Sequence, residues 1–271
     1  MKKKGKFTLL ELSELDAWVE AQVVHRRISL IQEHHTWSPA YAHFRGAIHF
    51  ALMEGMEASH LGRGFAEIAQ HFTTFPDGTV GVGRSLEKIP AGIKGANAEG
   101  ICIEHLGNFD AGKDAMASAH ETSIVRFNAL LCRKFRLAPS TATIVYHHWY
   151  DLDTGVRTGG TGNTKTCPGT GFFGGNSVAA AAANFVPSIA AELARLAGAA
   201  GPPAPALAAP LYQAKVTADS LNVRDQPSSA GRIVGSLKKE AAVNVYAEQD
   251  QWRRIHLTEM SWVSGRYLKT I

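Results

Sequence analysis

The sequence has few cysteines, little net charge and no long hydrophobic run. Its three cysteines in 271 residues are too few and too scattered for a disulfide framework. The 28 basic residues exceed the 24 acidic ones by only four, so the concentrated basic surface of nucleic-acid-binding proteins is not expected. The most apolar stretch, residues 178–200, is rich in alanine and includes charged residues and a proline. It predicts a pair of helices docked on a core, and we expect no integral membrane segment.

The N-terminus lacks the features of a signal peptide. Residues 1–6 are basic, but Glu11, Glu14 and Asp16 interrupt the apolar residues that follow, and no small-residue cleavage site occurs. We therefore expect the protein to stay in the cytoplasm or to leave it by lysis or a dedicated secretion system.

What the sequence does contain is typical of a globular protein. Apolar residues make up 45% of the chain and charged residues 19%, which is enough for a sizeable core. Twelve histidines exceed what packing requires and indicate acid–base or metal chemistry.

A proline- and alanine-rich segment divides the chain. Residues 198–210 (GAAGPPAPALAAP) include four prolines and no charge, which predicts an extended, semi-rigid linker. This places one domain at residues 1–197 and a second at residues 211–271.

The first domain mixes the two hydrophobic periodicities. Helical spacing occurs at residues 9–23, 41–57 and 115–137, and strand-like segments at 27–35, 69–75, 79–83, 100–106 and 142–148. The expected fold class is therefore α/β, a mixed central sheet flanked by helices. The second domain has five short strand-like runs with turns between them, which predict a small all-β barrel.

Polar residues capable of binding a metal follow several of these strands. His34 and His35 end one strand, His147 and His148 end another, and Cys167 lies further on. A hydrolytic zinc site needs three such ligands and an open position for water. The long spacing has little specificity by itself, and the alternative is hydrogen-bonded strand-end histidines with a buried, unreactive cysteine.

Four motifs occur in a characteristic order. They are His-His-Thr at 34–36, Ala-Gln-His-Phe at 69–72 with Pro-Asp-Gly-Thr-Val at 76–80, Ile-Cys-Ile-Glu-His-Leu-Gly at 101–107, and Lys-Thr-Cys-Pro-Gly at 165–169. Over residues 28–173 the sequence resembles the zinc-dependent N-acetylmuramoyl-L-alanine amidases of type 2, which share a fold with the peptidoglycan recognition proteins.

The resemblance implies a role for each site residue. His34, His147 and Cys167 would bind one catalytic Zn²⁺, with His148 as the alternative to His147 because a slip of one residue in register exchanges them. Glu104 would be the general base, and Lys165 would stabilise the oxyanion.

The implied activity is a bacteriolytic peptidoglycan hydrolase that cleaves the amide between N-acetylmuramic acid and L-alanine of the stem peptide. Its partner would be peptidoglycan or muropeptides, and it would act on the cell wall. The alternative is a non-catalytic peptidoglycan-binding protein on the same fold, in which the zinc ligands are typically incomplete. We expect the long loop at residues 149–164 to form a wall of the substrate groove; the sequence identifies no other substrate contact and no oligomeric state.

The second domain resembles bacterial SH3-like domains. The resemblance lies in Ala-Asp-Ser-Leu-Asn-Val-Arg-Asp-Gln-Pro at 218–227, Gly235 to Lys238, Gln249 to Trp252, Trp262-Val263 and Tyr267-Leu268. It implies a module that binds the cell wall, with at least one of the two tryptophans in the barrel core.

Overall fold

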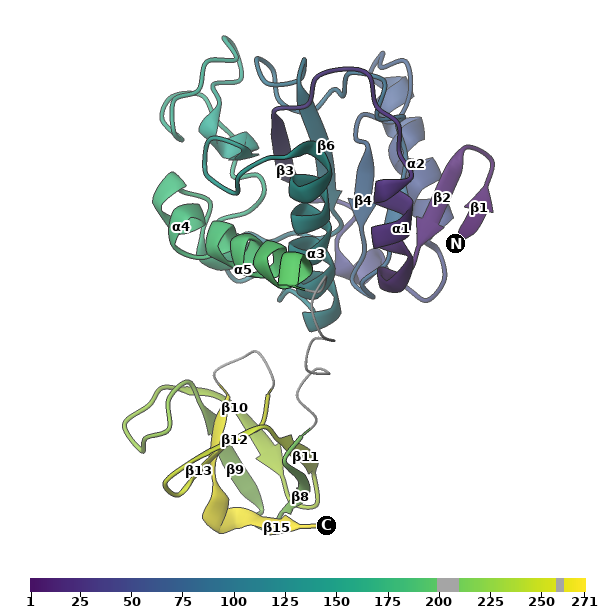
Figure 1. Cartoon of the computed structure of the whole chain (residues 1–271). Coiled ribbons are helices and arrows are strands. Elements are labelled where there is room, and N and C mark those ends of the chain that lie inside the picture. Colours follow the sequence, from purple (N-terminus) through teal and green to yellow (C-terminus); the bar gives the residue numbers. More distant parts are fainter. Residues whose placement is uncertain (199–209, 257–260) are drawn as a thin grey trace. The chain divides into compact units, whose positions relative to one another are not determined.

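The structure is a computed structural model that describes residues 1–198, 210–256 and 261–271. The chain divides into two compact units, Met1–Ala200 and Gly201–Ile271 (Figure 1). The expected linker at residues 198–210 lies outside the described residues except for Gly198 and Pro210.

A seven-stranded mixed sheet forms the centre of the first unit. Its spatial order is β1-β2-β5-β4-β6-β3-β7. Strands β4, β6, β3 and β7 are mutually parallel, and β5, β2 and β1 extend the sheet in antiparallel fashion. The strands are β1 (Lys2–Lys4), β2 (Phe7–Leu10), β3 (Leu30–His35), β4 (Phe72–Thr74), β5 (Val80–Val82), β6 (Gly100–His105) and β7 (Ile144–Tyr146).

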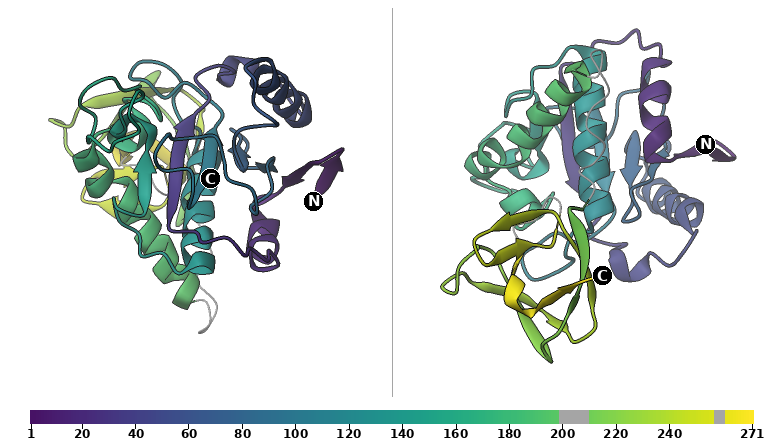
Figure 2. Two further views of the ribbon diagram at one scale, coloured as in Figure 1. Left: turned by 90° about the horizontal axis from the view of Figure 1, so that it is seen from above. Right: turned by 60° about the horizontal axis from the view of Figure 1, so that its bottom comes forward.

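Helices cover both faces of this sheet. They are α1 (Leu15–Glu20), α2 (His49–Gly62), α3 (Ser118–Phe135), α4 (Val178–Ala183) and α5 (Phe185–Gly198). Figure 2 shows α3 and α5 on one face and α2 on the other. Alternate residues of a strand face opposite sides, so β2 contributes Leu9 to the cluster around Met53 of α2 and Leu10 to the larger cluster around Phe127 of α3. The expected α/β class is confirmed.

Several predicted boundaries are wrong. The helix expected at residues 9–23 begins only at Leu15, because Leu9 and Leu10 belong to β2, which pairs with β5. The helix expected at 41–57 begins at His49, since Gly46 has a left-handed backbone (φ 64°) that interrupts any helix through it. Residues 178–198 do form a helix pair, and no helix in the described part of the chain is long and apolar enough to cross a membrane.

The second unit is all-β, as expected. It contains a five-stranded sheet in the order β10-β9-β14-β13-β12 and a three-stranded sheet in the order β11-β8-β15. The predicted strand at 242–248 is divided between the two sheets, and two further strands, β8 and β15, pair with each other. Trp252 and Trp262 are both buried. The strands are β8 (Tyr212–Val216), β9 (Ser220–Arg224), β10 (Ile233–Lys238), β11 (Ala242–Val245), β12 (Ala247–Gln249), β13 (Trp252–Arg254), β14 (Trp262–Ser264) and β15 (Leu268–Thr270).

Candidate metal centre

The predicted site residues His34, Glu104 and His147 lie close together at the ends of three parallel strands. Strand β3 lies between β6 and β7, and all three run in the same direction. His34 of β3 is the register partner of Glu104 on β6, and Glu33 pairs with Tyr146, the last residue of β7, which His147 follows directly. Directly opposed residues project to the same face, which brings His34 and Glu104 together, and the end of the neighbouring strand β7 places His147 next to them.

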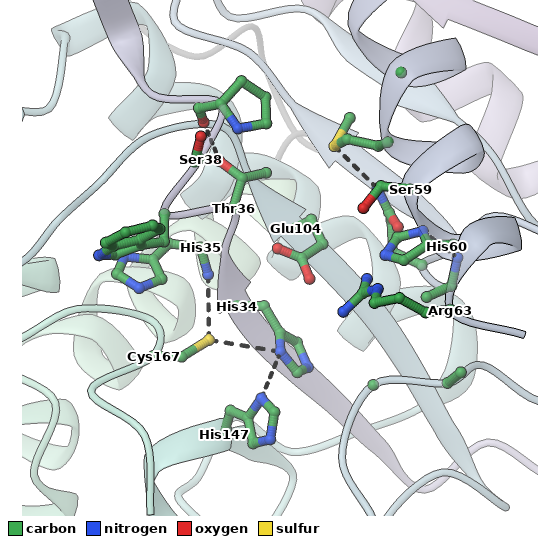
Figure 3. A pocket seen from close by; sticks show the side chains of 18 of the residues that line it. His34, His35, Thr36, Ser38, Ser59, His60, Arg63, Glu104, His147 and Cys167 are labelled. Carbon is green, nitrogen blue, oxygen red and sulfur yellow. Dashed lines mark hydrogen bonds between the residues drawn. The ribbon is translucent and has the colours of Figure 1, made fainter. Parts of the chain in front are cut away.

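Three of the predicted ligands form a compact cluster. Nδ1 of His147 lies 3.1 Å from Nδ1 of His34, and Sγ of Cys167 lies 3.6 Å from the same atom (Figure 3). Ligand atoms from all three residues lie within 4.8 Å of one another. Tetrahedral zinc with usual bond lengths separates two nitrogens by about 3.4 Å and a nitrogen and a sulfur by about 3.6 Å. The donor set and its spacing therefore fit a zinc ion.

The second histidine of the later doublet lies elsewhere. Nδ1 of His148 is 2.7 Å from the backbone oxygen of Lys165, so its side chain anchors the following loop. Strand β7 ends at Tyr146, and residues 147–149 form a turn of 3-10 helix that directs His147 alone toward His34. The structure thus places His147, and not His148, beside the other two predicted ligands.

Two backbone hydrogen bonds, one to the side chain and one to the carbonyl of Cys167, fix the loop that carries this residue. The backbone N–H of His35 donates to Sγ (3.4 Å), and the N–H of His148 donates to the Cys167 carbonyl (2.7 Å). Burial and the nearby Glu104 raise the pKa of the thiol well above its ordinary value, while the His35 N–H acts in the opposite sense. A bound cation would displace this proton, as metals do at cysteine ligands.

Both histidines of the cluster are held neutral. Burial, followed by the charge of His147, lowers the pKa of His34 well below its ordinary value. Burial and then Lys165 lower the pKa of His147 to about 4. Neutral imidazoles offer a lone pair, which is the form that binds metals.

Glu104 presents an unsatisfied carboxylate to the same space. Its Oε2 atom is inaccessible to solvent and has no hydrogen-bond partner among the described residues. Burial raises the pKa of this carboxyl to about 8, and the charges of Lys165 and Arg63 act against that increase. A buried oxygen without a partner is costly in a finished core, and it is typical of a site that completes itself with a proton, water or substrate.

A cavity of about 850 Å³ opens over these groups, and helix α2 forms one of its walls. This wall was not predicted from the sequence. In the sequence, the residues that line the cavity recur every fourth position, which places them on one face of the helix. They form two adjacent rows: Ala51, Gly55, Ser59 and Arg63, and Leu52, Met56 and His60. Figure 3 shows Arg63 pointing from α2 toward Glu104.

The loop at residues 149–164 does not line this cavity, contrary to expectation. The lining on that side begins at Lys165, an exposed residue. The loop folds on itself instead, because Asp151 accepts hydrogen bonds from the backbone N–H groups of Asp153, Thr154 and Asn163.

The backbone at Gly92 packs closely against the side chain of His34. A Cβ added at Gly92 would lie 2.2 Å from Oε1 of Gln32 and 3.0 Å from Nε2 of His34. The backbone N–H of Ile93 donates to the same Gln32 oxygen (3.1 Å). Only glycine allows the chain to approach the His34 side chain this closely.

A buried chain of polar side chains lies on the other face of the sheet. Glu33 contacts His105 (2.7 Å), and His105 contacts Thr74 (2.8 Å). Thr74 contacts His120 (2.6 Å), which contacts the hydroxyl of Tyr41 (2.8 Å). Burial raises the pKa of Glu33 to about 8 and lowers that of His105 to about 3, so the pair is neutral near pH 7. His105 therefore lies on the face of the sheet opposite to Glu104, its neighbour in the chain.

Two residues of the Ala-Gln-His-Phe motif, Gln70 and His71, have defined contacts. His71 accepts a hydrogen bond from the backbone N–H of Cys102 at Nδ1 (3.0 Å), and its Nε2 lies 2.9 Å from the Lys88 carbonyl, which makes it a structural residue. Gln70 lines the cavity and donates to Thr73 (3.0 Å).

Comparisons with known proteins agree with this architecture. The family model for N-acetylmuramoyl-L-alanine amidase matches residues 24–170, and the model for the bacterial SH3 domain matches residues 219–269. A comparison with curated proteins found no match.

Similar solved structures include amidases and recognition proteins. The endolysin amidase LysCS from Clostridium intestinale URNW is 21% identical, with 54% of this chain and 78% of that chain covered and a TM-score of 0.41. Drosophila PGRP-LB is 19% identical, with coverage of 56% and 81% and a TM-score of 0.45. Drosophila PGRP-SA is 20% identical, with coverage of 55% and 78% and a TM-score of 0.43.

The amidase model alone spans more than half of the chain, and it includes His34, Glu104, His147 and Cys167. The protein therefore belongs to the N-acetylmuramoyl-L-alanine amidase family and has a bacterial SH3 domain after its amidase domain.

Proposed function

We propose that this protein hydrolyses the amide bond between N-acetylmuramic acid and the L-alanine of the peptidoglycan stem peptide. The observation that carries the proposal is the clustering of His34, His147 and Cys167 next to the unpartnered carboxylate of Glu104 in one open cavity. Family membership supplies the reaction class.

We propose that His34 and His147, each through Nδ1, and Cys167 through Sγ hold a Zn²⁺ ion. A zinc ion there would supply a Lewis acid and bring the pKa of a bound water toward about 7. The protein's part is to hold two neutral imidazoles and a thiol, whose ligand atoms lie within 4.8 Å of one another, at the wall of the cavity.

In this proposal Glu104 moves the proton. Its carboxylate takes a proton from the attacking water as the new bond to the carbonyl carbon forms. It then gives that proton to the alanine nitrogen as the C–N bond breaks, which leaves a carboxylic acid on the sugar side and a free amine on the peptide. A pKa near 8 suits a group that must accept and then return a proton near neutral pH.

Lys165 is proposed to stabilise the carbonyl oxygen as it gains negative charge. The residue lines the cavity, and its charge already acts on both Glu104 and His147. A cation at this place favours the transition state over the neutral amide, which is the requirement for catalysis.

The intact ligand set favours an enzyme over a non-catalytic binding protein of the same fold. A chain that only bound peptidoglycan would need neither the cysteine nor a base beside the histidines. Here both are present and adjacent in space.

We further propose that residues 1–197 carry the activity and that the SH3-like domain, residues 211–271, binds the cell wall, where the protein would act. This domain has nine basic and six acidic residues, a net charge of +3. Tethering to an insoluble substrate raises the local concentration of enzyme at its target.

The test is digestion of purified peptidoglycan with and without a chelator, scoring new amino groups and new reducing ends. We expect new alanine amino termini, no reducing ends, and loss of activity under chelation with recovery on adding zinc. Reducing ends would mean glycan cleavage and would overturn the proposal, whereas binding to sacculi with neither product would favour the non-catalytic alternative.

A further inference from the structure

Trp37 is the exposed aromatic residue at the rim of the cavity. Its side chain is 60% exposed, and it lines the same cavity as the metal ligands. Among the described residues it is the one large apolar side chain that is strongly exposed and also lines this cavity. The other tryptophans pack into the protein: Trp18, Trp149, Trp252 and Trp262. An exposed indole does not contribute the stabilisation that its burial would give, so the position of Trp37 needs an explanation.

The backbone around Trp37 is held firmly in an unfavourable conformation. Trp37 has a left-handed backbone (φ 57°), which is rare for a bulky residue. Its N–H donates to the carbonyl of Gly107 (3.0 Å), and the N–H of Gly107 donates to the hydroxyl of Thr36 (2.9 Å). The loop therefore continues the pairing between β3 and β6 and presents the indole from a rigid base. Strain of this kind is retained mainly where it positions a functional group.

The chemistry of the indole suits a sugar ring. Its flat apolar face complements the C–H face of a pyranose, and its N–H can donate to a hydroxyl or acetamido oxygen. In the reaction proposed above, a short lactyl ether joins the sugar to the scissile carbonyl, so the ring must lie beside the metal ligands. Trp37 follows His34 by three residues, a span of at most about 10 Å.

The opposite wall of the cavity suits the peptide instead. Arg63 lines it from the end of α2. Its guanidinium lies over the ring of Phe65 (5.3 Å), and in the part of the chain that the structure describes no carboxylate forms an ion pair with it. Figure 3 shows Glu104 between Arg63 and the loop marked by Thr36 and Ser38, which flank Trp37. A guanidinium without a carboxylate partner matches the carboxylates of a stem peptide, which leaves the indole for the sugar.

We propose that Trp37 is a specificity-determining residue that stacks against the sugar ring next to the scissile amide. This inference rests on the proposed amidase function. It also assigns the direction of the substrate, with the glycan over the β3–β6 loop and the peptide toward α2.

The first test compares two substrates that differ only in the sugar. One is an N-acetylmuramoyl peptide, and the other is the same peptide carrying a lactoyl group in place of the sugar. Trp37→Gly should lower kcat/KM for the first about ten-fold or more and leave the second nearly unchanged, while Trp37→Tyr retains most of the preference. Leu61→Ala, an exposed residue of α2 outside the cavity lining, is the control. An equal fall in kcat/KM for both substrates would show that Trp37 does not recognise the sugar.

Stability provides a readout that separates recognition from structure. Trp37→Gly removes the left-handed strain and an exposed indole, so its melting temperature should equal or exceed that of the parent. A marked fall in melting temperature would mean that Trp37 has a structural role and would count against the proposal.

The second test does not depend on turnover. The disaccharide of N-acetylglucosamine and N-acetylmuramic acid, without peptide, is titrated into the full chain while tryptophan fluorescence is recorded. We expect saturable binding that Trp37→Gly weakens about ten-fold or more. No binding to the parent chain would overturn the inference about Trp37, whereas binding without hydrolysis of any muropeptide would overturn the proposed amidase activity alone.

Discussion

His34 and Glu104 face each other across the parallel pair of β3 and β6, as direct register partners. Burial acts on the two side chains in opposite directions, since it lowers the pKa of the imidazole and raises that of the carboxyl. Both groups are therefore neutral near pH 7 in the free protein. The arrangement provides a lone pair for a metal and, on the adjacent strand, a proton acceptor that a bound cation would help to ionise.

Cys167→Ala should remove the metal and the activity together. The substitution takes away the one sulfur donor of the cluster and leaves two imidazoles, which bind zinc far more weakly than three ligands. Zinc per chain, measured by mass spectrometry after dialysis, should fall to near zero. Cys132→Ala, which removes another buried thiol from α3, is the control and should keep its zinc. Full zinc content in Cys167→Ala would contradict the ligand assignment.

Glu104→Gln should keep the metal and lose turnover. The amide has the size of the carboxyl but cannot accept the proton of water, and general-base catalysis contributes roughly 10²–10⁴ in rate. The measurement is kcat on a soluble muropeptide, with zinc content determined on the same sample. Retention of the full rate would show that another group is the base.

The charge of Lys165 should set the pH at which the enzyme becomes active. In the proposed mechanism Glu104 is a general base and works deprotonated, so kcat/KM should rise as pH increases through its pKa. Lys165 holds that pKa down, and removing its charge allows the pKa to rise. The acid limb of the pH–rate profile of Lys165→Met should therefore move to higher pH, in addition to a loss of maximal rate.

Lys165→Arg is the matched control for this prediction. It keeps the positive charge, so its acid limb should stay where the parent's lies even if its maximal rate changes. An unmoved limb in Lys165→Met would mean that Glu104 does not respond to this charge.

Thr74→Val should destabilise the protein without touching the metal site. The hydroxyl of Thr74 joins His105 to His120 inside the core, and valine of nearly equal shape leaves a ring nitrogen of each histidine without that partner. Each unsatisfied buried polar group costs about 1–3 kcal/mol, so the free energy of unfolding should fall by about 2–4 kcal/mol.

Urea denaturation in the presence of chelator measures this effect without a contribution from metal binding. Thr8→Val, at a partly buried position on β2, should change the free energy by less than about 0.5 kcal/mol. Equal stability of Thr74→Val and the parent would show that the buried chain contributes no net stabilisation.

The sequence by itself determined the family, the α/β class, the second all-β domain and the residue types of the site. These follow from local patterns, because strand alternation and each of the four motifs occupy only a few consecutive residues. The wrong helix starts predicted at Leu9 and Tyr41 arise because local pattern alone does not decide the structure there. Apolar residues at these places fit either a helix or a strand until β5 and the turn at Gly46 select one.

Only the tertiary structure decided which groups meet. The choice of His147 over His148 depends on where β7 ends and on the 3-10 turn that follows, a matter of one residue that sequence patterns do not resolve. The α2 wall with Arg63, the rigid exposure of Trp37 and the buried chain from Glu33 to Tyr41 each join segments separated by tens of residues. Packing of the whole sheet, and not local propensity, sets those distances.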